Sequence, residues 1–139
     1  MPTFSDRVER ISISGIREVF EAAGADAINL GLGQPDFPTP EHAKRAAIDA
    51  IEAGDTDAYT GNKGTPELRE AIAAKHARDQ GVDVSPDDVI ATAGGSEALH
   101  LAMEAHVDAG QEVLIPDPGF VAYDALAKLA GGEPVPVPL

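Results

Sequence analysis

The chain of 139 residues contains no cysteine and no tryptophan, and residues of positive charge are few. Without cysteine it can form no disulfide bond, no thiolate nucleophile and no cysteine-ligated metal site, and we expect no metal site of another kind. Lysine and arginine number 10 against 24 aspartates and glutamates, which gives a net charge of −14. Because the phosphates of a nucleic acid repel so acidic a surface, the composition argues against a nucleic-acid partner.

Long apolar runs are also absent. No run is long enough to span a bilayer and the N-terminus has no apolar signal core, so we expect a cytoplasmic protein with no membrane partner. Hydrophobic residues make up 43% of the chain, enough for one domain with a core. The dispersed acidic residues resemble the composition of halophilic proteins, in which salt screens self-repulsion. An ordinary acidic protein from a low-salt cell is the alternative.

Capping signals and apolar periodicity predict mostly helices in the first 80 residues. Thr39 and Thr65 are expected N-caps, because each hydroxyl precedes a proline suited to the first helical position. The expected elements are a helical arm at 7–23 that breaks near residue 15, a short strand at 27–30, and helices at 40–53 and 66–79.

The second part of the chain alternates strands with helices. The expected elements are a strand at 89–93, a helix at 97–107, a strand at 112–116, a helix that opens at 118–120 and runs to 129, and an edge strand or extended tail at 133–139. This order is typical of a parallel sheet with helical crossovers, so we predict an α/β fold. Alternating prolines in the last segment argue against a central strand.

The function depends on a predicted strand that turns directly into a helix through Gly94, Gly95 and Ser96. A helix N-terminus presents unpaired backbone N–H groups, and the helix dipole adds partial positive charge. Glycine lets the backbone approach a ligand closely, and serine adds a hydroxyl. We therefore predict that these residues bind a phosphate. The same residues also suit a simple tight turn with serine as the N-cap.

An aromatic residue, Phe120, follows the next predicted strand. Ligands of parallel α/β sheets bind outside the carboxyl ends of the strands, so residues 94–96 and 117–120 are expected to border one crevice. A phosphate cradle and an aromatic ring at its two lips suit a flat, phosphorylated cofactor. In the alternative interpretation, Phe120 only anchors its own helix in the core.

Four segments together resemble the class I and II aminotransferases, pyridoxal phosphate enzymes of fold type I that include the aspartate aminotransferases. The segments follow the family's order and are Ile28–Phe37, its substrate loop; Tyr59–Ile72, its tyrosine loop and the next helix; Thr92–Leu99, its phosphate turn; and Asp117–Tyr123, which carries the stacking aromatic. The resemblance covers almost the whole chain. It implies an N-terminal arm and substrate loop at 1–40 and the first part of an incomplete, mostly parallel α/β cofactor-binding domain at 41–139.

The resemblance also implies residue roles. The phosphate turn, Gly94 to Ser96, would bind the phosphate of pyridoxal 5′-phosphate, and Phe120 would stack on the pyridine ring. Tyr59 would reach the phosphate of the neighbouring subunit's cofactor, which implies a homodimer with shared active sites. Gly33 would offer its backbone to the substrate carboxylate.

The residue that performs the chemistry in this family has no counterpart here. It is a lysine that forms a Schiff base with the cofactor and moves a proton, and none of Lys44, Lys63, Lys75 and Lys128 matches its position. We therefore predict no catalytic residue in this chain. We expect it to be the N-terminal part of an aminotransferase that acts on an amino acid and a 2-oxo acid. We also expect it to be inactive alone. A lyase or synthase of the same fold, or a non-catalytic cofactor-binding or interaction module, is the alternative.

Overall fold

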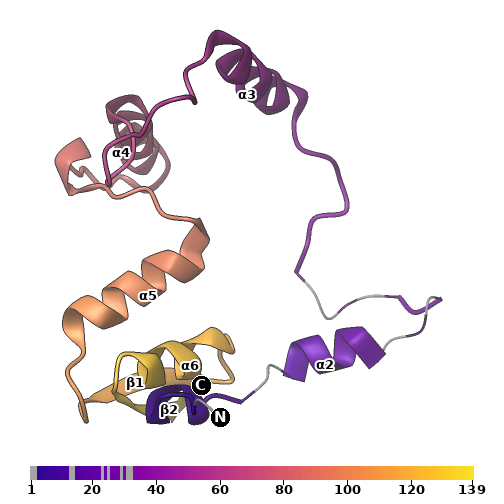
Figure 1. Ribbon diagram of the computed structural model, residues 1–139, viewed down its shortest axis with the longest axis vertical. Coiled ribbons are helices and arrows are strands. Elements are labelled where there is room, and N and C mark those ends of the chain that lie inside the picture. The colour runs from indigo at the N-terminus through magenta and orange to yellow at the C-terminus, as the bar shows by residue number, and fades with distance from the viewer. Residues whose placement is uncertain (1–2, 13–14, 23, 25, 29, 31–32) are drawn as a thin grey trace. The chain divides into compact units, whose positions relative to one another are not determined.

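The computed structural model spans residues 1–139 and describes all of them except 1–2, 13–14, 23, 25, 29 and 31–32 (Figure 1). In chain order the elements are α1 (Asp6–Glu9), α2 (Gly15–Ala22), α3 (Glu41–Ala53), α4 (Pro66–Gln80), the 3₁₀-helix η1 (Pro86–Asp88), α5 (Gly94–His106), β1 (Glu112–Asp117), α6 (Ala122–Leu129) and β2 (Glu133–Pro138). They form two compact units, one of Met1–Gly33 with Ala93–Leu139 and the other of Gln34–Thr92.

The first unit is built on a strand–helix–strand crossover. β1 and β2 pair in parallel, from Glu112 opposite Glu133 to Asp117 opposite Pro138. α6 connects the two strands and packs against both, and it also contacts α5 and α1. Its Ala127 is completely buried. The parallel pairing confirms the α/β order that we predicted for this part of the chain.

β2 is an edge strand whose outer side is blocked by proline. The N–H of Glu133 donates to the Gln111 carbonyl over 2.8 Å, and that of Leu139 donates to the Asp117 carbonyl over 3.1 Å. Backbone groups of successive strand residues point to opposite edges of the strand. The N–H groups of the odd-numbered residues of β2 therefore point to β1, and its three prolines occupy the positions whose N–H would point away. Proline has no N–H to donate, so this side offers no donors to a further strand.

The N-terminal arm forms two short helices, α1 and α2, and the break near Gly15 is confirmed. α1 is attached to the crossover by two arginines. Arg10 forms an ion pair with Glu133 at 2.7 Å, and Arg7 donates a long hydrogen bond of 3.5 Å to the Leu129 carbonyl. These contacts place α1 beside α6.

In the second unit, α4 begins as predicted. The Thr65 hydroxyl oxygen accepts a hydrogen bond from the Leu68 N–H at 3.3 Å, and Pro66 takes the first helical position. α4 packs against η1, and Ala73 and Val89 are buried. The predicted start of α3 is wrong by one residue, because Pro40 has an extended ψ of 137° and is itself the N-cap.

Two predicted strands do not form in the described residues. Segment 89–93 is in no strand, and its Ala91 N–H donates to the Lys63 carbonyl at 2.9 Å. Ala27, Ile28 and Leu30 are likewise in no strand, and Asn29 lies outside the described residues. A strand needs a neighbouring strand for its backbone groups, and among the described residues neither segment is paired in a sheet.

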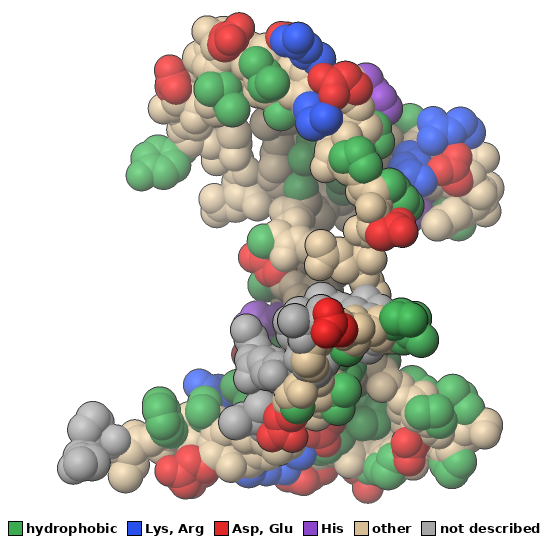
Figure 2. All heavy atoms as spheres, turned by 90° about the vertical axis from the view of Figure 1, so that its right-hand side faces the viewer, with side chains coloured by type: hydrophobic (Ala, Val, Ile, Leu, Met, Phe, Trp, Pro, Cys, Tyr) green, Lys and Arg blue, Asp and Glu red, His purple; other side chains and the backbone are tan. Residues whose placement is uncertain are grey.

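Many large apolar side chains are exposed, as the hydrophobic patches among acidic side chains in Figure 2 show. Leu114 on β1 is 70% exposed and Ile51 on α3 is 64% exposed. Apolar surface on this scale is typical of faces that other chain segments cover. Among the described residues, no helix combines the length and the apolar character needed to cross a bilayer. The same residues contain no group of three or more metal-ligating side chains.

Candidate cofactor-binding site

The predicted phosphate turn, Gly94 to Ser96, is the first turn of α5, which therefore begins three residues before its predicted start at Glu97. Gly94 has a φ of +79°, in the left-handed region that residues with a Cβ rarely adopt, so this position requires glycine. No side chain lies within 4 Å of the position that a Cβ would take on Gly94 or Gly95. All three residues are exposed, so the turn is open to a ligand.

The side chain of Glu97 lies against this helix start. Its carboxylate accepts a hydrogen bond from the backbone N–H of Ala93, the N-cap residue. An acidic group in the first turn is stabilised by the helix dipole, but it also places negative charge beside the turn. No lysine or arginine lies between residues 93 and 107. Within this segment, positive potential therefore comes from the backbone.

The donors of the turn fit a phosphate group. α5 is 13 residues long, and the N-terminus of such a helix binds anions through backbone N–H groups without a charged side chain. The Ser96 hydroxyl adds a donor, and the glycines leave room for close approach. That Gly94, Gly95 and Ser96 bind a phosphate stays a prediction.

Phe120 lies just before α6. The helix begins at Ala122 with Val121 as its N-cap, so the prediction that Phe120 lies in the opening of this helix is wrong. The phenyl ring is 50% exposed and makes an edge-to-face contact with Tyr123, with ring centres 5.6 Å apart. It is thus not a buried core anchor in this structure. The exposed ring surface is available to another flat group.

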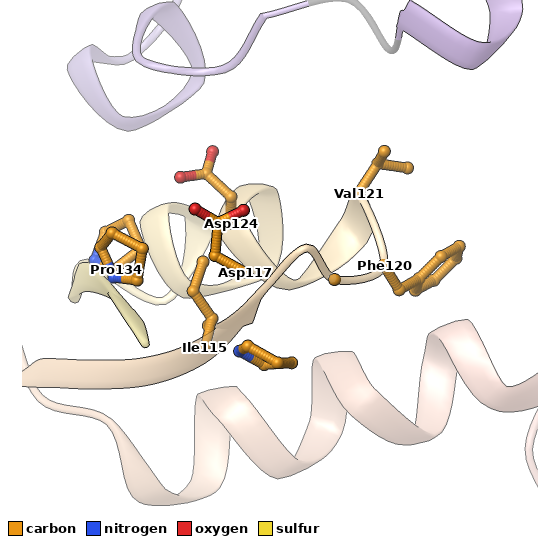
Figure 3. Close-up of a pocket in the computed structure, with 9 residues that line it drawn as sticks. Ile115, Asp117, Phe120, Val121, Asp124 and Pro134 are labelled. Atoms are coloured by element: carbon orange, nitrogen blue, oxygen red, sulfur yellow. The ribbon is translucent and has the colours of Figure 1, made fainter. Parts of the chain in front are cut away.

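The loop that presents Phe120 is tightly folded. A Cβ on Gly119 would collide with the Pro116 carbonyl oxygen, so only glycine fits there. Beside the loop is a pocket of about 290 Å³. Figure 3 shows Asp117 and Asp124 projecting from one part of its wall and Phe120 directed away from them. Asp124 is paired with Lys128 at 2.6 Å.

The structure brings some of the predicted site residues into the same unit and leaves others apart. The phosphate turn, Phe120 and Gly33 belong to the first unit, in which α5 packs against α6. Gly33 lies in a loop with no heavy atom near its Cβ position, and the preceding residues 31–32 lie outside the described part. Tyr59 belongs to the second unit and is fully exposed.

One network in the second unit was not predicted from the sequence. The Arg69 guanidinium donates to the Pro86 carbonyl at 2.8 Å and to the Asp87 carboxylate at 3.2 Å. The Lys63 ammonium donates to the Asp87 carbonyl at 2.7 Å. These partners are 17 to 24 residues apart in sequence. No local sequence pattern predicts such a pairing, because it depends on how distant parts of the chain fold together.

Comparison with known proteins identifies the family that this geometry resembles. The family model for aminotransferase class I and II matches residues 25–139. A probable aspartate aminotransferase of Methanocaldococcus jannaschii is 48% identical over 93% of this chain and 34% of its own length. The aspartate aminotransferase of Pyrococcus horikoshii is 47% identical over 97% of this chain and 35% of its own length.

Solved structures agree. The aspartate aminotransferase of Rhizobium meliloti superposes with a TM-score of 0.93 at 37% identity over 100% of this chain and 36% of its own. That of Thermus thermophilus, solved with maleate, gives 0.90 at 39% identity over 99% and 37%. The chain thus spans about a third of the length of these relatives. Its fold is part of the fold type I domain of pyridoxal phosphate enzymes, as predicted.

Proposed function

The chain belongs to the family of class I and II aminotransferases, and we propose that the protein it contributes to is a transaminase. It would move an amino group between an amino acid and a 2-oxo acid with pyridoxal 5′-phosphate as its cofactor. The observation that carries this proposal is that α5 begins at Gly94-Gly95-Ser96, with glycine required at its first residue. The close relatives are aspartate aminotransferases.

In this proposal the phosphate turn anchors the cofactor. Backbone N–H groups at the start of α5 and the Ser96 hydroxyl donate to the phosphate. Once the cofactor is bound, it supplies an electron sink for the reacting carbon.

Phe120 contributes the stacking surface. Its half-exposed phenyl ring, held by the glycine loop and by the edge contact with Tyr123, would lie on the pyridine ring and fix its plane. Gly33 would donate from its backbone to the carboxylate of the substrate. In this proposal residues 1–40 form the N-terminal arm and substrate loop, and residues 41–139 form the first part of the cofactor-binding domain.

Tyr59 extends the site to a second subunit. Its side chain is fully exposed, in a loop between α3 and α4. A phenol in that position is free to donate to a phosphate held by another subunit. We propose a cytoplasmic homodimer in which each active site receives a tyrosine from its partner.

The lysines of this chain are all engaged elsewhere. Lys44 pairs with Glu41 at 2.6 Å, Lys75 with Asp79 at 2.5 Å and Lys128 with Asp124 at 2.6 Å, while Lys63 bonds to the Asp87 carbonyl. A lysine that acts as nucleophile and proton carrier must be free to deprotonate. We therefore propose that the catalytic lysine comes from outside these residues, and that these 139 residues alone have no activity.

The test is cofactor binding and amino transfer by the full-length protein. Ser96→Ala and Phe120→Ala should each raise the Kd for pyridoxal 5′-phosphate about tenfold, the usual loss for one charge-assisted hydrogen bond or one stacking ring. Titration of the cofactor absorbance measures Kd. Ser12→Ala and Phe4→Ala are matched controls, since both residues are exposed in the N-terminal arm.

Two outcomes would overturn this proposal. An unchanged Kd in both site variants removes the assigned roles of Ser96 and Phe120. Tight cofactor binding with release of ammonia or carbon dioxide, instead of amino transfer to a 2-oxo acid, identifies a lyase of the same fold.

Charge supports one further part of the proposal. The acidic residues exceed the basic ones by 14, and self-repulsion of this kind weakens as salt shortens the Debye length to about 3 Å at 1 M. We propose that the protein works in concentrated salt. Its melting temperature in KCl should then rise up to molar concentrations, and a maximum at low salt would contradict the proposal.

A further inference from the structure

The tyrosine loop, residues 59–64, is bound to the segment that leads into the phosphate turn, residues 86–91. The Lys63 ammonium donates to the Asp87 carbonyl at 2.7 Å, and the Lys63 carbonyl accepts from the Ala91 N–H at 2.9 Å. One residue of the loop thus bonds to both ends of that segment. Sequence continuity places Ala91 three residues before Gly94.

Arg69 at the start of α4 reinforces the same connection. It donates to the Pro86 carbonyl at 2.8 Å and to the Asp87 carboxylate at 3.2 Å, and its side chain is only 16% exposed. The Asp87 side chain is 90% exposed, so the ion pair is screened by water and weak. The partly buried bond to the carbonyl is the stronger of the two contacts.

Gly64 closes the remaining space. Its φ is +93°, and a Cβ there would lie 2.8 Å from the Ala91 Cβ. A side chain at this position would meet Ala91, so glycine lets the loop lie close to segment 86–91, and the two Lys63 bonds oppose a shift away. The loop and the segment therefore move together.

We propose that Lys63 and Arg69 are positioning residues that couple the tyrosine loop to the segment before the phosphate turn. This inference rests on the proposed function, in which Tyr59 serves the partner's active site and Gly94 to Ser96 serve their own. The side chains of Lys63 and Arg69 bond to Pro86 and Asp87, and neither residue is assigned a contact with cofactor or substrate in the proposed function. They act by holding two elements that serve different active sites in one rigid arrangement.

The experiment uses the full-length protein and a double-mutant cycle on the Kd for pyridoxal 5′-phosphate. Arg69→Met should raise Kd about tenfold, the equivalent of one lost, partly buried charge-assisted bond. In a Tyr59→Phe background the same substitution should change Kd less than about threefold, because its effect passes through the tyrosine. Lys63→Arg, which keeps a donor, should recover most of the affinity lost in Lys63→Met.

Controls separate positioning from general destabilisation. Arg78→Met removes an arginine of the same helix whose side chain is 69% exposed and pairs only with its neighbour Asp79 among the described residues, so Kd should not change. Asp87→Asn removes only the exposed ion pair and should change Kd little. Additive effects of Arg69→Met and Tyr59→Phe, or an unchanged Kd in Arg69→Met, would overturn the inference.

A second readout does not depend on the cofactor. Hydrogen exchange at the Ala91 amide, which is bonded to the Lys63 carbonyl, should become faster in Arg69→Met and Lys63→Met and stay unchanged in Arg78→Met. Unchanged exchange in the first two variants disproves the coupling even if the enzyme binds its cofactor. If exchange is faster in these two variants but the wild-type protein does not bind the cofactor, the coupling holds and the proposed function fails.

Discussion

α6 and α3 are both helices that the sequence predicts, but their surroundings differ. α6 has only eight residues, yet it packs against both strands and buries Ala127 completely. α3 has 13 residues and buries none of them, and it packs against no other element in the described part of the chain. Helix formation thus follows local sequence, whereas burial depends on partners that other segments supply.

The strands show the same difference. β1 forms because β2 returns beside it through α6, and the two share a regular parallel ladder. Segment 89–93 is also mostly apolar but forms no strand within the described part of the chain. Since a strand cannot satisfy its own backbone groups, composition alone does not produce one.

The largest expected effect tests burial in the two helices. Ala127→Asp places a charge in a site that is completely buried and should lower the free energy of unfolding by about 3 kcal/mol. Ala46→Asp in α3 is exposed and should cost only the difference in helix propensity, about 0.6 kcal/mol. Urea denaturation of the 139-residue chain measures both. Equal costs would show that α3 is covered after all.

Gly119 lies in a crowded turn and Gly95 in an open one. Gly119→Ala forces a Cβ against the Pro116 carbonyl and should destabilise the protein by about 2 kcal/mol. Gly95→Ala has open space and a helical position, so it should stabilise by about 0.5 kcal/mol. In the full-length protein Gly95→Ala should also weaken cofactor binding. Thermal melting and cofactor titration distinguish the two effects, and a destabilised Gly95→Ala variant would contradict the open turn.

Two apolar residues outside helices extend the comparison to the strands. Val89 is only 9% exposed. Val89→Thr should lower the free energy of unfolding by about 1.5 kcal/mol, because it places a hydroxyl in an apolar site. Leu114 is 70% exposed, and Leu114→Thr should change stability by less than about 0.5 kcal/mol in the 139-residue chain. The same substitution in the full-length protein measures whether another segment covers β1. A larger loss there would show that it does.

The smallest expected effect on stability concerns Asp79 on α4, whose ion pairs with Lys75 and Arg78 are exposed to solvent. Hydrogen bonds from Lys75, and next from Arg78, lower the pKa of its carboxyl below the ordinary value. A lowered pKa contributes stability above the ordinary value that is lost as pH falls through the lowered one. Asp79→Asn should therefore reduce the melting temperature slightly at neutral pH and not at strongly acidic pH. A difference that grows with acidity would contradict this sign.

Much of the fold follows from local signals. Thr65 and Pro66 predict the start of α4 correctly, because capping involves neighbours within one turn. The alternating prolines predict an edge strand or an extended tail for a similar local reason, and the strand β2 forms there. For the candidate site, Gly94, Gly95 and Ser96 were found as a strand-to-helix junction, and the structure places them at the first turn of α5 although the strand before them is missing.

The sequence by itself determined that most of the helices form, though not where α3, α5 and α6 begin, and it determined the β1–α6–β2 crossover. Each of these depends on residues that are neighbours or connected by one short crossover. Only the tertiary structure decided that Ala91 in segment 89–93 donates to the Lys63 carbonyl and that the segment forms no strand. It also decided that Arg69 bonds to Pro86 in η1 and that the Phe120 ring is half exposed. Such contacts join residues distant along the chain. They form only where the whole fold makes the gain of a bond or a packed surface exceed the entropy lost in closing the loop.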